Sequence, residues 1–437
     1  MRWCNWTNAT AEQRHAALER PGRKQTAELQ ATVSSLVDDV RQRGDAALLE
    51  LTARLDGVEL EALEVTDSEW QRAAQGVSAQ ARAAIRRARE QLERFHAAQK
   101  HRPIDMEVSP GVRCQRVARP IARIGLYAPG GTAPLPSTVL MLGVPAAIAA
   151  NPVRVLCTPP DTSGGVEPHI LAAAHEVGIQ RVFKLGGAQA IAAMAYGTKT
   201  VPKVDKIYGP GNAWVTEAKA QCARDPQGAA LDLPAGPSEV LVVADASARA
   251  EFVAADLLSQ AEHGRDSQVV LVTTDDTLAK ATREAIDAQL QTLPRRHIAA
   301  AALEQGAVVR VASVAEGMEV ANAYAPEHLI LHLQQASQWV EHVQHAGSVF
   351  VGPWSPEAIG DYASGTNHVL PTYGFARTLS GLSVDDFVRH MTVQELTPGG
   401  LEELGPSVET LAHLEGLDAH RQAVSVRRRA LHGESQQ

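Results

Sequence analysis

Cysteine is scarce in this sequence, and the cysteines it has lie far apart. The four are Cys4, Cys114, Cys157 and Cys222. No two of them form a CxxC motif, and this spacing argues against both a thiolate zinc cluster and a disulfide scaffold. Unpaired cysteines fit a reducing compartment, so we expect the protein to be cytoplasmic.

Long apolar runs are also absent. No stretch approaches the ~18 to 20 uninterrupted apolar residues of a membrane-spanning helix. The first residues carry one positive charge but no long apolar core, which argues against an ordinary secretion signal. We therefore expect no membrane span and no export by that route.

Positively charged residues are fewer than negatively charged ones. The chain has 41 Lys and Arg against 50 Asp and Glu, a formal net charge of −9. A broad basic face is therefore not available, which argues against nucleic acid or an anionic membrane as a partner. The most compact basic run, Arg427 to Arg429, is typical of a solvated helix end.

Aromatic residues make up only 4% of the chain, whereas Ala, Val and Leu are abundant. This balance favours helices and strands that pack through small aliphatic side chains, as in α/β proteins. The length of 437 residues allows two or three domains with cores of their own.

The order of apolar patterns predicts two α/β units. After an N-terminal segment (1–25), residues 26–95 have the periodicity of helices. Short apolar strands then alternate with helices, which predicts parallel pairing with right-handed crossovers. We predict two Rossmann-like α/β domains with parallel sheets. The first combines residues 26–120 with 239–377, the second is an insertion at 121–238, and 378–437 form a mostly helical C-terminal arm.

Three strand-to-helix junctions in the predicted insertion carry glycine. They are Pro129-Gly130-Gly131, Gly186-Gly187-Ala188-Gln189 and Gly209-Pro210-Gly211-Asn212. Glycine at the carboxyl end of a parallel strand lets main-chain N–H groups approach a phosphate. None of the junctions is a GxGxxG motif, so tight turns and a dinucleotide site both remain open interpretations.

The segment Ala325–Leu331 places a carboxylate and an imidazole side by side. Pro326 ends a predicted helix and Leu329–Leu331 is a predicted buried strand, so Glu327 and His328 lie between them. A histidine with a pKa near ~6.5 can take a proton from an alcohol, and a partly desolvated glutamate can take one from water. The alternative is a solvated loop residue beside a histidine at a strand edge.

Metal ligands are suggested by Gln260 and His263, which lie three residues apart at the end of a predicted helix and so share one face. Asp361 and His420 offer a further carboxylate and imidazole. Oxygen and nitrogen ligands without thiolate suit Zn²⁺, with Mn²⁺ or Co²⁺ tolerable. By spacing alone, a helix C-terminus stabilised by a histidine is the simpler interpretation.

Longer stretches of the chain resemble the histidinol dehydrogenase family. The resemblance runs in register over about Ile121 to Val426 and is looser before Arg102. The segments that carry it are Gly125–Leu140, Gly209–Lys219, Asp232–Glu239, Ser259–His263, Ala325–Leu329 and Gly360–Thr372.

The resemblance implies a zinc-dependent, NAD-linked enzyme with one zinc ion per subunit. Such enzymes oxidise L-histidinol through L-histidinal to L-histidine with two NAD⁺, as the last step of histidine biosynthesis. Carried over by position, Glu327 and His328 would be the acid–base pair. The implied zinc ligands are Gln260, His263, Asp361 and His420.

The same resemblance implies the binding residues. Substrate would be bound by seven residues, and His368 is a lower-ranked contact. The seven are Ser238, Gln260, His263, His328, Asp361, Glu415 and His420. The dinucleotide would be bound by Tyr127, Gln189 and Asn212. The family forms homodimers, so the arm would carry Glu415 and His420 into the partner's site.

Other functions are left open by the sequence. A paralogous zinc and NAD-dependent dehydrogenase could act on another small diol, such as a sulfonated propanediol. An acidic Glu415 suits a substrate with an amine and would repel a sulfonate. A metal-assisted hydrolase and a non-catalytic scaffold are two further hypotheses.

Overall fold

The computed structural model describes residues 1–20, 27–100, 102–130, 134–234 and 236–433. They form two compact units. Unit 1 comprises Met1–Gln99 with Ile121–Asp386, and unit 2 comprises Lys100–Pro120 with Phe387–Gln437. Unit 1 contains two parallel sheets, and unit 2 is built on an antiparallel one.

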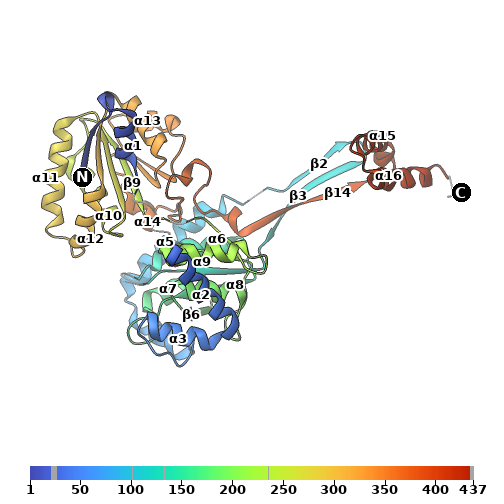
Figure 1. Cartoon of the computed structure of the whole chain (residues 1–437), viewed down its shortest axis with the longest axis horizontal. Helices are drawn as coiled ribbons and strands as arrows, with labels where there is room; N and C mark the ends of the chain where they lie inside the picture. Colours follow the sequence, from blue (N-terminus) through green and yellow to red (C-terminus); the bar gives the residue numbers. More distant parts are fainter. Residues whose placement is uncertain (21–26, 101, 131–133, 235, 434–437) are drawn as a thin grey trace. The chain divides into compact units, whose positions relative to one another are not determined.

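Sheet A of unit 1 has six parallel strands in the order β1-β11-β10-β9-β12-β13 (Figure 1). The strands are β1 (Arg2–Asn5), β9 (Glu239–Ala244), β10 (Gln268–Thr273), β11 (Ala307–Arg310), β12 (His328–His332) and β13 (Ser348–Val351). Apart from β1 at one edge, the chain forms the sheet from its centre: β9 comes first, β10 and β11 are added on one side, and the chain then crosses back to add β12 and β13. The switch point of this doubly wound sheet therefore lies between β9 and β12.

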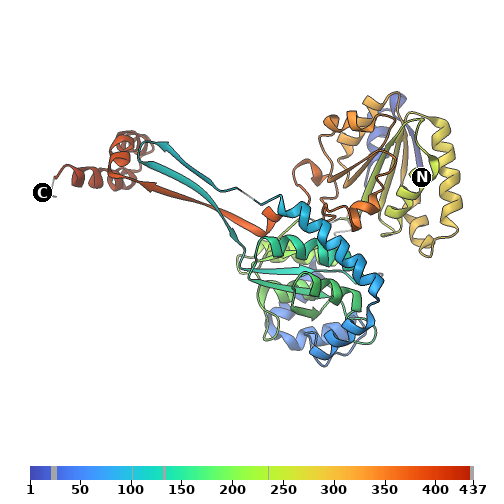
Figure 2. The same ribbon diagram turned by 180° about the vertical axis from the view of Figure 1, so that it is seen from behind.

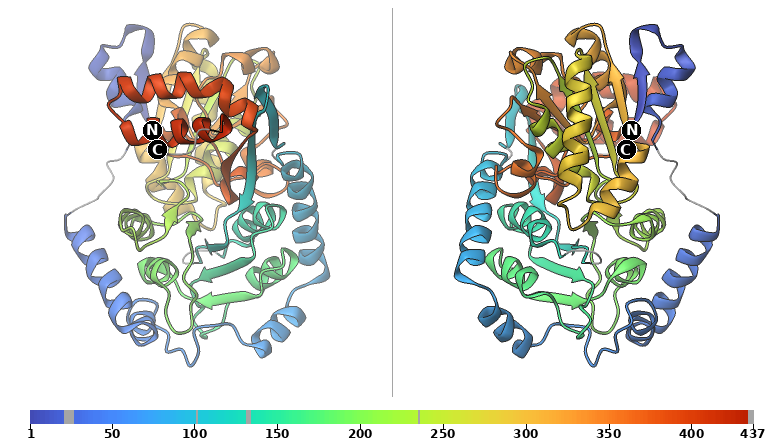
Figure 3. Two further views of the ribbon diagram at one scale, coloured as in Figure 1. Left: turned by 90° about the vertical axis from the view of Figure 1, so that its right-hand side faces the viewer. Right: turned by 90° about the vertical axis from the view of Figure 1, so that its left-hand side faces the viewer.

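Helices cover both faces of sheet A. Apolar side chains of α10 (Ala250–Ala261), α11 (Asp276–Leu290) and α12 (Arg296–Gln305) pack on one face. The other face packs against α13 (Val314–Tyr324), α1 (Ala11–Leu18) and the 3-10 helix η2 (Ala336–His342). The strands lie between the two helical layers (Figure 3). Strands β9 and β10 are buried along their whole length, as expected for parallel strands covered on both faces.

Sheet B of unit 1 repeats this winding with five parallel strands in the order β6-β5-β4-β7-β8. The strands are β4 (Arg123–Tyr127), β5 (Val153–Thr158), β6 (Arg181–Lys184), β7 (Lys206–Tyr208) and β8 (Ala230–Leu231). Its switch point lies between β4 and β7. The helices that alternate with these strands are α6 (Pro136–Ile148), α7 (Pro168–Glu176), α8 (Gly187–Tyr196) and α9 (Ala213–Arg224).

The helical lead-in packs on sheet B. Its helices are α2 (Ala27–Arg43), α3 (Asp45–Leu55), α4 (Asp67–Gly76) and α5 (Ala79–Ala97). Helices α2 and α3 contact α8, and α4 and α5 contact α7. In Figure 2 the lead-in helices flank those of sheet B. The predicted division groups residues 26–120 with sheet A instead, because an apolar helix face predicts burial but does not identify its partner.

Unit 2 holds sheet C, an antiparallel sheet in the order β14-β3-β2, and two helices. Its elements are β2 (Ile104–Ser109), β3 (Val112–Pro120), β14 (Val388–Leu396), α15 (Pro398–Leu414) and α16 (Asp418–Leu431). The prediction of a mostly helical chain after residue 378 is wrong for β14. That strand is exposed along most of both faces, so it lacks the alternation of apolar and polar residues that marks a half-buried strand.

The α/β fold with two parallel sheets is confirmed, and the predicted strands and helices of both alternating regions are present. Strand β1 was not predicted. It is four residues long and pairs in parallel with β11 at the edge of sheet A. Unit 1 also contains the short helix α14 (Glu357–Tyr362) and 3-10 helices at Trp6–Asn8 and Phe375–Arg377, and a further 3-10 helix, Val384–Phe387, spans its last residues. Among the described residues, no helix is both long and apolar enough to cross a membrane.

Candidate active site

The predicted acid–base residues and three of the predicted ligands share one edge of sheet A. His328 is the first residue of β12, next to the start of β9. Helix α10 follows β9 and precedes β10, two parallel neighbours, so it runs back across the sheet and ends at the edge where the strands begin. Gln260 in its last turn and His263 just beyond it therefore lie near His328, and α14 brings Asp361 to the same place.

Glu327 and His328 are both buried, at 6% and 4% exposure. The Glu327 carboxylate accepts a hydrogen bond from the Glu239 main-chain N–H at 2.8 Å, and His328 Nδ1 lies 3.1 Å from the Glu239 carbonyl oxygen. A carbonyl can only accept, so Nδ1 carries the hydrogen and Nε2 is the basic atom of the neutral ring. Nε2 lies 3.4 Å from Asp361 Oδ1.

The surroundings of this pair shift both pKa values. Burial raises the pKa of Glu327 to about 8, with nearby Glu239 and Asp361 adding to the effect. Burial alone would lower the pKa of His328, but the carboxylates of Glu357, Glu327 and Asp361 outweigh it and raise that pKa to about 10. A glutamate with a pKa near neutrality is suited to act as a general base on water.

A group of possible metal ligands lies beside the pair. One ligand atom from each of His263, Glu357 and Asp361 can be chosen so that all three lie within 4.8 Å of one another. His263 Nε2 is 4.0 Å from Asp361 Oδ2. The Gln260 amide lies against the Glu357 carboxylate, and when turned to satisfy both groups its nitrogen donates to Glu357 Oε2 at 3.1 Å.

These residues fit zinc. If the Gln260 amide is turned the other way, its oxygen faces the Glu357 carboxylate, an arrangement that a nearby cation or a proton on Glu357 makes favourable. The donors are one imidazole nitrogen and carboxylate or amide oxygens, which suit Zn²⁺. Glu357 was not predicted, although its position four residues before Asp361 on one helix could have indicated it.

The remaining residues predicted near the metal lie in different places. Ser238 directly precedes β9, and its carbonyl oxygen accepts from the Gln268 N–H at 2.9 Å. His368 Nδ1 contacts the Asp361 carbonyl oxygen at 2.8 Å, so its ring helps to position the main chain of α14. Glu415 and His420 lie in unit 2, at the end of α15 and in the first turn of α16, and both are exposed.

The three predicted dinucleotide contacts are found at the carboxyl edge of sheet B. Tyr127 ends β4, and its hydroxyl oxygen accepts from the Gly187 N–H at 3.0 Å. The Asn212 side chain caps the start of α9. Gln189 is 1% exposed, and its amide oxygen has no hydrogen-bond partner among the described residues. The predicted junction at Pro129–Gly131 is described only as far as Gly130.

The switch point of sheet B is tightly constrained at Gly209. A Cβ atom on this residue would lie 2.1 Å from the Tyr127 carbonyl oxygen, and its φ of +118° favours glycine. Its N–H donates to Asp232 Oδ2 at 2.7 Å and its carbonyl oxygen accepts from Lys219 Nζ at 2.9 Å. A switch point of a doubly wound sheet that lies next to the start of a helix, here α9, fits a dinucleotide site.

Comparison with known proteins identifies the family to which this chain belongs. The profile of histidinol dehydrogenase matches residues 19–428. The chain belongs to the histidinol dehydrogenase family. It is 51% identical to the histidinol dehydrogenase of Vibrio parahaemolyticus over 427 residues, with 98% of each chain covered. It is 52% identical to that of Vibrio cholerae, again with 98% of each chain covered.

A solved structure agrees with the histidinol dehydrogenase assignment. The crystal structure of the Elizabethkingia anophelis enzyme superposes with a TM-score of 0.94 at 46% identity, covering 99% of each chain. The resemblance noted in the sequence is thus confirmed over nearly the whole chain. The protein is an oxidoreductase of the histidinol dehydrogenase family.

Proposed function

We propose that the protein oxidises L-histidinol through L-histidinal to L-histidine, as the last step of histidine biosynthesis. The reaction would remove four electrons with two NAD⁺ and use one zinc ion per subunit. The observation that carries the proposal is the buried Glu327–His328 pair, which lies beside the His263–Glu357–Asp361 cluster in a chain of this family. The four free cysteines are compatible with action in the cytoplasm.

The charge of the site supports histidinol over the alternative diol. Glu327, Glu357 and Asp361 place three carboxyl groups around His328. A site rich in carboxyl groups favours a substrate that carries an ammonium group and disfavours one that carries a sulfonate. The paralogous dehydrogenase of a sulfonated diol is therefore the weaker candidate.

Gln260, His263 and Asp361, with His420 from the arm of a second subunit, would hold the zinc. Bound zinc would anchor the amine and imidazole of the substrate. It would also offset the negative charge of Asp361 and its neighbours, which raises the pKa of His328 in the metal-free site, and so would let Nε2 act as a base. Tyr127, Gln189 and Asn212 would hold NAD⁺, which accepts the hydrides. The chain's own residues are then left with the proton transfers.

In the first oxidation, His328 Nε2 would take the hydroxyl proton of histidinol, and bound NAD⁺ would accept the hydride from the carbinol carbon, which gives the aldehyde. The hydrogen bond from Nδ1 to the Glu239 carbonyl keeps Nε2 free for this task. Glu327 then takes a proton from the water that adds to the aldehyde carbon, and His328 returns its proton to the carbonyl oxygen, which gives the hydrate and regenerates the basic Nε2. His328 would take a hydroxyl proton of this hydrate while a second bound NAD⁺ would accept the hydride, and the resulting acid loses its proton to solvent to give the carboxylate.

The decisive experiment is the ratio of NADH formed to histidinol consumed. We expect a ratio near two, because alcohol and aldehyde would be oxidised in the same site. Absorbance of NADH together with amino-acid analysis of the product gives both quantities. A ratio of one would indicate a simple alcohol dehydrogenase, and no NADH from histidinol with zinc present would reject the proposal.

Asp361→Asn is expected to weaken zinc binding, because the variant loses a charged oxygen ligand. Changes to the outer partners of metal ligands already lower affinity roughly 10–100-fold, so a ligand change should cost at least that. Zinc per chain after dialysis against a chelator series measures the effect. His297→Ala is the control, since His297 is exposed on α12, and it should retain zinc as the unchanged protein does. Equal zinc retention by both variants would contradict the assigned ligand.

A further inference from the structure

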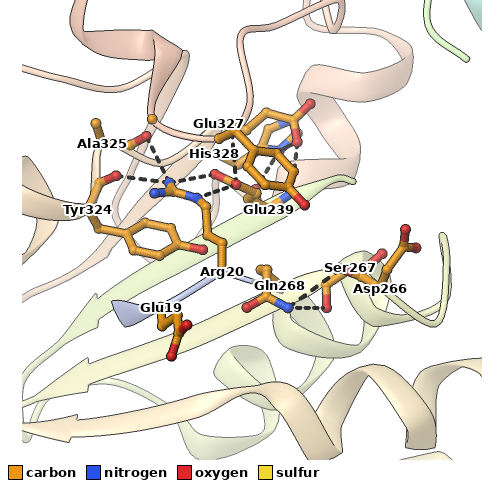
Figure 4. Close-up of polar contacts among 12 residues, drawn as sticks. Glu19, Arg20, Glu239, Asp266, Ser267, Gln268, Tyr324, Ala325, Glu327 and His328 are labelled. Carbon is orange, nitrogen blue, oxygen red and sulfur yellow. Dashed lines mark hydrogen bonds and ion pairs between the residues drawn. The ribbon is translucent and has the colours of Figure 1, made fainter. Parts of the chain in front are cut away.

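The side chain of Arg20 enters the same edge of sheet A from the N-terminal segment (Figure 4). Its Nε lies 2.5 Å from Glu239 Oε1 and its Nη2 2.9 Å from Glu239 Oε2, a two-pronged ion pair. The Glu239 side chain has no exposed surface and that of Arg20 retains 14%. The guanidinium carbon also lies 3.8 Å from the centre of the Tyr324 ring.

Glu239 connects this ion pair to both residues of the acid–base pair. Its main-chain N–H donates to Glu327 Oε2, and its carbonyl oxygen accepts from His328 Nδ1. Its carboxylate, besides pairing with Arg20, accepts from the Tyr373 N–H at 2.9 Å. The orientation of Glu327 and His328 therefore depends on the main chain of one residue, and the side chain of that residue is held by Arg20.

Arg20 also reaches the turn that leads into Glu327. Its Nη2 donates to the carbonyl oxygens of Tyr324 at 2.9 Å and of Ala325 at 3.4 Å. Ala325 has a φ of +54°, and Tyr373, at the other side of Glu239, has a φ of +56°. Non-glycine residues hold such a conformation only where the surroundings impose it, and such residues cluster at functional sites.

We infer that Arg20 is a positioning residue for Glu327 and His328, acting through Glu239 and the Tyr324–Ala325 turn. The inference rests on the proposed function, since the activity that Arg20 would support is the proposed oxidation of histidinol. The contacts of Arg20 do not depend on that function. Only the planar fork of arginine can serve the Glu239 carboxylate and the two carbonyl oxygens together. A lysine would keep the charge but not this geometry. A buried ion pair is by itself weak support for a purely stabilising role.

The test replaces Arg20 by Met and by Lys in the full-length, zinc-loaded protein. In Arg20→Met we expect kcat to fall about 10- to 100-fold for both histidinol and histidinal, because displaced catalytic groups lose rate steeply with small shifts. The KM for NAD⁺ and the zinc content should not change. Arg20→Lys should lie between Arg20→Met and the unchanged protein. All rates are measured well below the unfolding midpoint of each variant.

Arg14→Met is the matched control. Arg14 also lies over an aromatic ring, 5.1 Å from the centre of Trp6, and its Nε donates to the Trp6 carbonyl oxygen at 3.0 Å. Arg14→Met loses a ring contact and a hydrogen bond to a main-chain carbonyl, as Arg20→Met does. Arg14 makes no bond to Glu239, so kcat should be unchanged. If Arg20→Met does not fold, the same measurements are made on Arg20→Lys and Glu239→Gln. Glu239→Gln keeps the main-chain hydrogen bonds to Glu327 and His328 and removes the ion pair.

A double-variant cycle separates positioning from stability. If Arg20 acts through His328, then Arg20→Met combined with His328→Asn should lower kcat by less than the product of the single effects. The inference would be overturned if the loss of kcat in the double variant equalled the product of the two single losses. It would also be overturned if kcat of Arg20→Met were unchanged. Failure of the proposed function is seen separately, as an unchanged protein that forms no NADH from histidinol.

Discussion

Glu327→Gln is expected to slow the oxidation of L-histidinal about 100-fold or more while leaving the first oxidation of L-histidinol much less affected. The loss of a general base typically lowers the rate by roughly two to four orders of magnitude. The glutamine oxygen can still accept the Glu239 N–H that now reaches Glu327 Oε2, so the site should keep its shape. What the variant lacks is a group able to take a proton from water.

Rapid-quench kinetics with each substrate measures the two halves. From histidinol the variant should form one NADH quickly and the second slowly, and added semicarbazide should trap the aldehyde. His328→Asn should slow both halves, because the asparagine amide can replace Nδ1 toward the Glu239 carbonyl but not the basic Nε2. Glu217→Gln, a change at a buried carboxylate of α9, is the control for loss of a buried charge. Equal losses in both halves for Glu327→Gln would contradict the separate roles.

Much of the fold was predictable because parallel strands buried on both faces are continuous apolar runs. Strand β9, for example, is buried at every position and stands out in the sequence. Strands β1 and β14 escaped prediction for a different reason. Each is stabilised by pairing with a neighbouring strand, β11 or β3, rather than by an apolar face of its own.

The candidate site was predictable where its residues lie close in the chain. Glu327 and His328 are adjacent, and Gln260 and His263 are three apart at a helix end, so local spacing was enough to propose them. Their mutual proximity required the winding of sheet A, which brings the start of β12 beside β9. The family resemblance supplied the roles of these residues, which spacing alone could not.

Arg20 had no signal in the sequence. It lies 219 residues from Glu239 in the chain, and an arginine near a helix end is ordinarily a solvated residue. Its contacts follow from α1 packing against sheet A, which sets the Arg20 side chain over Tyr324. Long-range ion pairs of this kind become visible only when the fold is known.

The C-terminal arm carries two predicted site residues that have no enclosed environment within unit 2. Glu415 and His420 are exposed. Apolar side chains around them are exposed too, with Leu411 at 59%, Leu414 at 75% and Leu417 at 42%. Apolar surface gathered around polar functional groups is typical of a surface that another chain covers. This supports the proposal that the arm completes the site of a partner subunit in a homodimer.

Two inactive variants should therefore restore activity when combined in one dimer. His328→Asn removes a residue of unit 1 and His420→Ala one of unit 2, and each homodimer should be inactive or nearly so. If the arm acts across the dimer, a heterodimer has one site with both defects and one site with none. We expect about half the wild-type kcat for such a heterodimer, since one of the two symmetric sites is intact.

Co-expression with two different affinity tags, followed by sequential purification on both, isolates the heterodimer for the assay. The matched control pairs His328→Asn with Asp361→Ala, both in unit 1. Every site of that heterodimer carries one defect, so it should remain inactive. If the His328→Asn and His420→Ala pair also remained inactive, His420 would act within its own subunit.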